Sequence, residues 1–363
     1  MKNKIAIASA FFAASSLSFA EIALTENLSV EGFVNMSYSH TEDDAQAADE
    51  TGNNYSLDQV EISFLLDFDA VGAQIDLQWV DVGGASVDQA FTTYSLSNGI
   101  VVTAGRYDSM LGFEAFEPTG LFQDSKAYES DTEVLIDANI TYSDLITPGT
   151  NNGVKVSYET ETDFFGISLQ DGAFFGDGRL GGDNDNSVQA FIAQVTQAPD
   201  VDGGRSGYAI EAAYAKDLGN GFNAFLGAVF EETEAVIAGA DLDIESTVYN
   251  AYITYETGAW LFAAEYTITE HAFDLGFLEA DIDVDSALVM ANYSYSDQAS
   301  ITGRISHVDA DDLLEATKFT LAHSYAFTDN LLLVAEVSAV EYEFEAGGDG
   351  ETLEGALSLL FTF

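Results

Sequence analysis

The sequence lacks cysteine altogether and has only three prolines and 10 lysine and arginine residues in 363 positions. Without cysteine the chain contains neither a disulfide framework nor a thiolate metal site. Pro118, Pro148 and Pro199 fall between the segments that alternate like strands, as expected in a sheet protein because proline cannot donate a ladder hydrogen bond. No segment after residue 20 is a long uncharged apolar run, so no transmembrane helix is predicted.

Positive charge is scarce and negative charge is abundant. The 62 Asp and Glu residues against 10 Lys and Arg give a net charge of −52. A nucleic-acid partner is not expected, because phosphate contacts need clustered Lys and Arg. Such a surface suits a salty medium rich in divalent cations, where screening is short-ranged. A soluble halophilic β-protein would carry a similar charge, so charge alone leaves the class of protein open.

The N-terminus has the three parts of a bacterial export signal. Lys2 and Lys4 supply positive charge, residues 5–14 form a short apolar run, and residues 18–20 form a small-x-small cleavage site. The apolar run is too short to anchor the chain in a bilayer. We therefore predict that residues 1–20 are a removed signal peptide and that residues 21–363 form a single mature domain.

The mature chain is dominated by alternation with a period of two, which is typical of β-strands with two different faces. The first such strand places Leu28, Val30 and Val34 on one parity, and Glu31 and Asn35 on the other. Later strands repeat this scheme with charged and amide side chains on the second face. In a sandwich that face would meet solvent, whereas in a membrane barrel it would line a wet lumen.

The C-terminal segment separates these two architectures. Leu357, Leu359, Phe361 and Phe363 lie on one parity, and the chain ends on an aromatic residue. Soluble chains usually end in frayed, polar residues. The segment resembles the terminal β-signal of bacterial outer-membrane barrels, whose last strand is read by the barrel assembly machinery. The resemblance favours a membrane barrel and implies the assembly machinery as a partner that reads Phe363.

Short turns alternate with longer acidic segments along the chain. The short turns lie at residues 218–221, 257–259, 296–298 and 328–330, and the longer segments lie at 40–54, 231–245, 270–285 and 345–351. Aromatics such as Tyr255 and Trp260 flank the short turns, as in an interface belt. The asymmetry predicts an all-β, transmembrane antiparallel barrel with short periplasmic turns and long extracellular loops. Because both termini would be periplasmic, the strand number is even, and we predict about 16, with 18 as the alternative.

One long stretch without clear alternation follows a strand that ends in Gly105-Arg-Tyr107. The stretch then continues with Gly112-Phe-Glu114 and Pro118-Thr-Gly-Leu121. This series resembles bacterial porins, particularly the OmpL-like β-barrel porin group, and more loosely the general Gram-negative porins. The resemblance implies a third loop, at about residues 108–152, that folds into the lumen and narrows it.

The same resemblance implies that the carboxylates of the loop lie at the pore constriction, namely Glu114, Glu117 and Asp124. Strand alternation points three basic residues into the lumen from the wall, namely Lys155, Arg304 and Lys318, and Arg106 lies at the base of the loop. Opposed charges of this kind set up a transverse field that orients solutes. Wall cations are fewer here than in the general porins, and carboxylates around a wet pore concentrate cations, so a cation preference is expected.

Other chemistry has little support in the sequence. The four histidines show no zinc-ligand spacing, and no metal site is predicted from them. His307 precedes three aspartates, but no nucleophile motif accompanies it, so no enzyme is expected. Residues 183–186 and 281–285 are acidic without matching an EF-hand, so loosely bound Ca²⁺ at acidic loops is the one cofactor considered.

We therefore expect a passive diffusion channel for small hydrophilic solutes in the outer membrane of a Gram-negative bacterium. Its partners would be outer-membrane lipid, lipopolysaccharide and the assembly machinery, and porin analogy implies a homotrimer. Three alternatives stay open. The barrel could be a channel selective for a sugar or an ion, or a non-conducting structural or adhesive barrel, and a soluble acidic sandwich is the third.

Overall fold

The computed structural model describes the chain from residue 21 onward, with gaps: residues 21–43, 50–80, 84–128, 133–135, 140–141, 145–174, 206–237, 240–274, 279–311, 313–345 and 347–363. The predicted signal peptide, residues 1–20, lies outside the described residues. Within these ranges no helix is long and apolar enough to cross a membrane.

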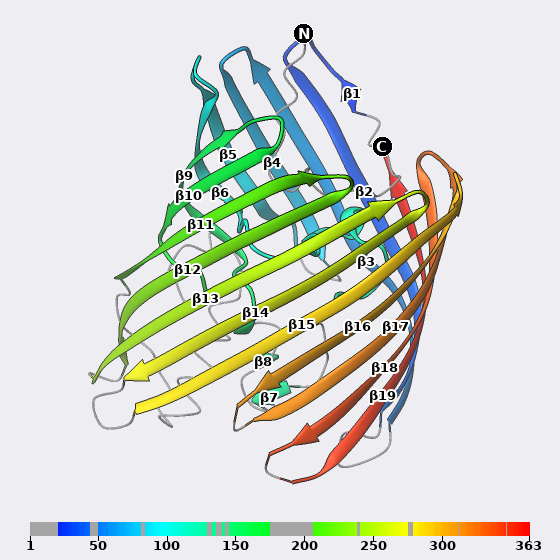
Figure 1. The fold of residues 1–363 in the computed structure, drawn as a ribbon. Helices are drawn as coiled ribbons and strands as arrows, with labels where there is room; N and C mark the ends of the chain where they lie inside the picture. The colour runs from blue at the N-terminus through cyan, green and yellow to red at the C-terminus, as the bar shows by residue number, and fades with distance from the viewer. Residues whose placement is uncertain are drawn as a thin grey trace.

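Sixteen strands among the described residues form a closed antiparallel barrel (Figure 1). The strands are β2 (Leu28–Asp43), β3 (Glu50–Phe68), β4 (Val71–Val80), β5 (Ser86–Ser95), β6 (Ile100–Asp108), β9 (Thr150–Glu159), β10 (Asp163–Gln170), β11 (Ser206–Gly219), β12 (Phe222–Ile237), β13 (Ala240–Thr257), β14 (Trp260–Asp274), β15 (Glu279–Ser296), β16 (Ala299–Ala310), β17 (Leu314–Thr328), β18 (Leu331–Phe344) and β19 (Asp349–Thr362). The predicted number of 16 is confirmed, and the alternative of 18 is wrong.

Closure joins the last strand to the first. In the β19–β2 ladder, Leu359 lies opposite Met36 and Thr362 opposite Phe33. Phe363 extends the ladder, because its N–H donates to the Gly32 carbonyl over 2.9 Å and its carbonyl accepts from the Gly32 N–H over 2.9 Å. Both termini lie at the same end of the barrel in Figure 1. A closed ladder leaves no sheet edge, which is the condition for strands to span a membrane.

Strand β14 shows how the alternating sequence becomes a barrel wall. Leu261 and Glu265 are buried toward the interior, while Phe262 and Tyr266 on the other parity are exposed. Trp260, at the turn, stacks on Tyr293 of β15 with 4.5 Å between ring centroids. The outer face is therefore apolar from Trp260 to Ile268 and aromatic at the turn end, as a lipid-facing surface requires, and it becomes charged at Glu270 and Asp274.

The predicted short turns are confirmed, but the predicted acidic loops at the opposite end are shorter than expected. Strand β12 continues to Ile237 and β13 begins at Ala240, so the segment expected as a loop at residues 231–245 is mostly strand. Hydrophobic alternation fades there while the backbone ladder continues. The outward side chains here, such as Glu234 and Glu245, are polar, as are the buried inward side chains of Glu231 and Thr233, so hydrophobic alternation no longer marks the pairing.

Strand β15 likewise extends into one of the two acidic segments that were considered for Ca²⁺. Residues 281–285 lie inside β15, paired with β14, so the expectation of an acidic loop at this position is wrong. Residues 183–186 lie outside the described residues.

Four small elements of the described residues lie off the sixteen main strands. Strand β1 (Ile22–Ala23) pairs with β2, and β7 (Glu133–Leu135) pairs with β8 (Ile140–Thr141). The 3₁₀ helix η2 (Pro118–Gly120) and the β7–β8 pair belong to the connection between β6 and β9, residues 109–149, which we call loop 3.

Candidate functional site

Loop 3 leaves β6 and crosses the barrel interior, where carboxylates of the opposite wall bind its backbone. Glu211 Oε1 on β11 accepts hydrogen bonds from Ser109 Oγ and the Met110 N–H, each over 2.6 Å. Glu265 Oε1 on β14 accepts from the Phe113 N–H over 2.7 Å. An ionised carboxylate only accepts hydrogen bonds, so it matches a loop that presents N–H groups.

A third wall carboxylate binds the loop further along. Glu336 Oε2 on β18 accepts from the N–H groups of Asp124 and Ser125 over 2.7 and 3.2 Å, and its Oε1 accepts from Ser125 Oγ over 2.5 Å. The Tyr128 hydroxyl donates to Glu265 Oε2 over 3.2 Å. Loop 3 is thus attached to three strands across the interior, which fixes its backbone inside the barrel.

One buried ion pair joins the loop to the wall. Arg304 Nη1 on β16 lies 2.5 Å from Glu114 Oε1, and the two side chains are 0% and 11% exposed. The same guanidinium donates to the carbonyls of Ser125 and Lys126 over 2.9 and 3.0 Å. The planar fork of arginine serves several acceptors at once, which a lysine ammonium does not do with the same geometry.

Glu114 has further donors within loop 3. Gln123 Nε2 donates to its Oε1 over 2.5 Å, and the Ala127 N–H donates to its Oε2 over 2.6 Å. Lys318 Nζ on β17 donates to the Lys126 carbonyl over 3.3 Å. Glu114 therefore organises the turn of the loop as well as the contact with the wall.

A second group of polar side chains lies where loop 3 meets β3 and β5. Gln59 Nε2 donates to Glu117 Oε2 over 2.9 Å, and Arg106 Nε donates to the Asp88 carbonyl over 2.6 Å. Burial, together with the carboxylates of Asp88 and Asp108, raises the pKa of Glu117 to about 8. Carboxyl groups from separate elements are concentrated here, in contrast to the Glu114–Arg304 contact, where an arginine faces the carboxylate.

Apolar contacts complete the attachment of the loop. A cluster of buried side chains brings loop residues Leu111, Leu145 and Ile146 against wall residues that include Val229 and Val248. Phe113 packs edge-on against Tyr252 with 5.7 Å between ring centroids. Part of the interior wall is therefore covered by the loop and does not face open water.

The seven site residues predicted from the sequence fall on loop 3 or beside it. Glu114, Arg304 and Lys318 come together at one contact, where Asp124 contributes its backbone N–H to Glu336. Glu117 and Arg106 belong to the second group, beside Asp88. Lys155 lies apart from both, with Nζ 4.5 Å from the centroid of the Tyr107 ring.

Sequence reasoning missed the wall carboxylates that bind the loop, Glu211, Glu265 and Glu336, and those that face Glu117, Glu61 and Asp88. The signal was present for four of them, since Glu61, Glu211, Glu265 and Glu336 are acidic residues on the inward parity of a strand. Asp88 departs from this rule, because a register shift in the β4–β5 ladder separates it from the parity of the buried Phe91 and Thr93. Alternation alone gives the direction of a side chain but not the loop that it meets.

A closed antiparallel barrel whose long loop is fastened inside the lumen is the architecture of an outer-membrane channel. The Gram-negative porin family matches residues 5–345 of this sequence, so the chain belongs to that family. It is therefore a β-barrel of the outer membrane of Gram-negative bacteria, as the sequence predicted. No curated protein matches the sequence.

Solved porin structures share the fold at low sequence identity. The outer-membrane channel DcaP of Acinetobacter baumannii is 12% identical with a TM-score of 0.63, and covers 93% of this chain and 97% of its own. An anion-selective porin from Comamonas acidovorans is 11% identical with a TM-score of 0.60, covering 93% and 99%. Salmonella typhi OmpF, solved with daunomycin, is 13% identical with a TM-score of 0.58, covering 94% and 100%. At these identities the likeness concerns the fold.

Proposed function

We propose that this porin is a passive diffusion channel for small hydrophilic solutes and that it prefers cations over anions. The observation that carries the proposal is the imbalance of charge on the interior side of the wall and on loop 3. Buried or half-buried carboxylates gather there from several strands, namely Glu61, Asp76, Asp88, Asp108, Glu211, Glu265 and Glu336.

The basic residues of the interior are fewer and are engaged with the loop. Arg304 is paired with Glu114, and Lys318 donates to a loop carbonyl. Lys155 lies over an aromatic ring, between the charges of Asp108 and Glu211. A water-filled passage beside such a wall has a negative potential, which raises the local concentration of cations and repels anions.

The decisive experiment is planar-bilayer recording of the refolded mature protein in a KCl gradient. Stepwise conductance with a reversal potential toward the K⁺ equilibrium value is the expected result. An anion-directed reversal potential would overturn the cation preference while leaving the channel intact. Stable insertion without conductance would overturn the diffusion channel itself.

A non-conducting structural barrel is the second candidate, and a specific observation favours it. The apolar cluster that joins Leu111, Leu145 and Ile146 to the wall covers interior surface that an open pore would leave wet. Liposome swelling with sugars of increasing size distinguishes the two functions. Swelling that stops above a definite solute size supports a pore, and no swelling with the smallest sugar supports the structural barrel.

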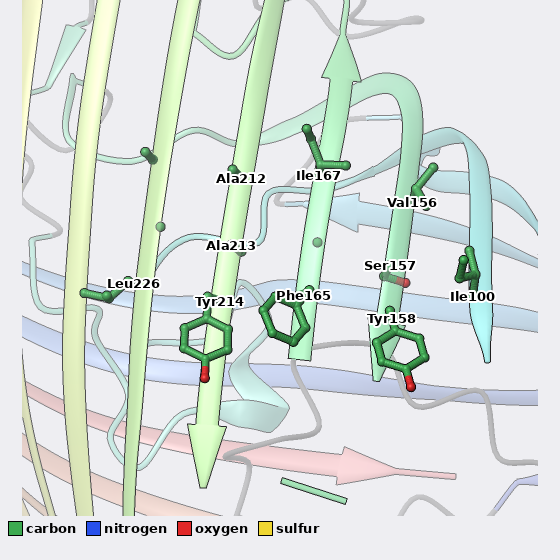
Figure 2. Close-up of a pocket in the computed structure, with 13 residues that line it drawn as sticks. Ile100, Val156, Ser157, Tyr158, Phe165, Ile167, Ala212, Ala213, Tyr214 and Leu226 are labelled. Atoms are coloured by element: carbon green, nitrogen blue, oxygen red, sulfur yellow. The ribbon is translucent and has the colours of Figure 1, made fainter. Parts of the chain in front are cut away.

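We also propose a homotrimer that interacts with lipopolysaccharide and with the barrel assembly machinery. One solved relative, OmpT of Vibrio cholerae, is described as a trimer form, at 11% identity and a TM-score of 0.55. An apolar groove of about 580 Å³ lies on the outer face, across β6, β9, β10, β11 and β12. Figure 2 shows the side chains that line it. Its exposed side chains include Phe165, Ile167 and Leu226, which suit contact with lipid or another subunit. Chemical cross-linking in native membranes tests the trimer.

A further inference from the structure

Three carboxylates from three separate elements meet beside the turn of loop 3. They are Glu61 on β3, Asp88 on β5 and Glu117, the residue that precedes η2. One carboxylate oxygen from each lies within 4.8 Å of the others. Two oxygens on opposite sides of a Ca²⁺ ion are about 5 Å apart, and around Mg²⁺ about 4 Å apart. The spacing of the three oxygens is therefore that of a coordination shell.

A separate observation is that two buried carboxylate oxygens at this place have no donor. Glu61 is 7% exposed and Asp76, on the neighbouring strand β4, is 1% exposed. Among the described residues, Glu61 Oε2 and Asp76 Oδ1 have no hydrogen-bond partner. The two carboxylates interact electrostatically with each other and with Asp88. Ser63 Oγ donates to the other oxygen of Glu61 over 3.1 Å, and Gln74 Nε2 donates to the other oxygen of Asp76 over 2.9 Å. A buried anionic oxygen without a donor is costly, so the two unpartnered oxygens call for a cation or a proton.

Nearby basic residues offset part of the charge. Arg106 and Lys126 lie close enough to Asp88 to interact with it, and Lys126 also interacts with Glu117. The Arg106 Nε donates to the Asp88 carbonyl over 2.6 Å. Asp108 adds a further negative charge that acts on both Asp88 and Glu117. Carboxylates still exceed cations at this end of the loop.

We propose that Glu61, Asp88 and Glu117 bind a divalent hard cation, preferentially Ca²⁺, which fastens loop 3 to β3 and β5. The ligands are all oxygens, the class that Ca²⁺ takes, and they come from loop 3 and two strands. Mg²⁺ demands near-ideal octahedral geometry and gives up its water reluctantly, so it fits such a set less well. Asp76, on the neighbouring strand β4, interacts electrostatically with Glu61 and adds negative charge to the site.

The cation would compete with protons. The three carboxylates are crowded together and buried or half-buried, so without a cation a proton is the alternative partner for their negative charge. Carboxylates must lose their protons to ligate a metal, so binding releases protons and strengthens as pH rises. This property separates the site from loose screening of exposed acids, which are already ionised at neutral pH.

The test is calorimetric titration of CaCl₂ into the refolded, metal-free mature protein in detergent, at a pH of about 9 and in enough KCl to suppress loose binding. One saturable site is expected, with Ca²⁺ binding tighter than Mg²⁺. Glu117→Gln and Asp88→Asn should each weaken it at least about tenfold. Asp281→Asn, which removes the same charge from an exposed position on β15, should leave it unchanged. Binding is measured without conductance, so the result does not depend on an open pore.

Folding of each variant is checked by the heat-dependent shift of the barrel on an electrophoresis gel. If Asp88→Asn does not fold, Glu117→Gln on the loop decides the test, and the Ca²⁺-dependent rise in Tm of the wild type provides a second measurement. The proposal is overturned if no saturable site exists, if both variants bind as the wild type does, or if Asp281→Asn weakens binding equally.

Discussion

The guanidinium of Arg304 on β16 and the carboxylate of Glu114 on loop 3 form an ion pair of 2.5 Å inside the barrel. The Ser125 and Lys126 carbonyls accept from the same guanidinium. The residue that alternation directs into the lumen therefore acts as an anchor for loop 3. A second ion pair, between Lys216 and Asp163, lies at the surface and offers a direct comparison.

Arg304→Leu is expected to release loop 3. Removing one partner of a buried ion pair leaves an uncompensated charge and costs about 3–5 kcal/mol. Trypsin should then cut after Lys126, whose carbonyl the guanidinium binds in the wild type. The measurement is the rate of tryptic cleavage at Lys126, followed by mass spectrometry. Lys216→Gln breaks the exposed pair and should leave that rate unchanged; equal rates in Arg304→Leu and wild type would contradict the anchoring role.

Glu336→Gln is expected to loosen the middle of the loop. An amide keeps one acceptor oxygen but places a donor against the N–H groups of Asp124 and Ser125, which the carboxylate satisfies. A hydrogen bond to a charged group contributes about 1.5–3 kcal/mol, and this is the expected loss of stability. Denaturant unfolding of the refolded barrel gives the free energy. Glu341→Gln, an exposed position on the same strand, is the control and should be neutral.

Cation selectivity should depend on pH through Glu117. Its raised pKa, about 8, makes the carboxyl neutral below that pH and negative above it. Reversal potentials in chelator should therefore move toward stronger cation preference as pH rises from about 7 to about 9. Glu117→Gln should weaken this pH dependence, and a variant that keeps the full dependence would refute the assignment.

The raised pKa of Glu117 also makes the free energy of unfolding depend on pH. The folded protein binds the Glu117 proton more tightly than an unfolded chain does, whose ordinary pKa is 4.5. The contribution of this group to the free energy of unfolding is therefore largest at low pH and falls as pH rises from 4.5 to about 8. Comparing the pH dependence of unfolding in wild type and Glu117→Gln isolates this contribution.

Deleting Phe363 should impair closure. Its backbone exchanges two hydrogen bonds of 2.9 Å with Gly32, and its ring lies 6.1 Å from that of Phe361 between centroids. The truncated chain is expected to reach the outer membrane several-fold less and, when refolded, to unfold at lower denaturant concentration, because net losses of about 1 kcal/mol per hydrogen bond weaken the seam. Membrane fractionation and unfolding curves measure the two effects. Wild-type amounts in the outer membrane and a wild-type unfolding curve would show that Phe363 is not needed for barrel closure.

Several features followed from local pattern. The two-residue period fixed the directions of Lys155, Arg304 and Lys318, and the short turns were found where glycine and polar residues interrupt it. Strand ends at the acidic side were misjudged because Glu231 and its neighbours pair as strand without an apolar parity. Beyond the apolar band, β12 and β13 are paired by backbone hydrogen bonds, which the hydrophobic pattern of the sequence does not reveal.

By itself the sequence determined the class of this protein: an exported, cysteine-free, acidic chain of alternating strands closed by a terminal aromatic. These properties depend on the two-residue alternation, on the composition and on the position of residues along the chain, all of which can be read from the sequence. Only the tertiary structure decided what loop 3 meets. Glu211, Glu265 and Glu336 bind its backbone, and Glu61 and Asp88 face Glu117, because barrel closure brings residues far apart in sequence together. The pattern of side chains along the sequence does not show which backbone N–H groups of the loop will meet a wall carboxylate. It also does not give the distance across the lumen.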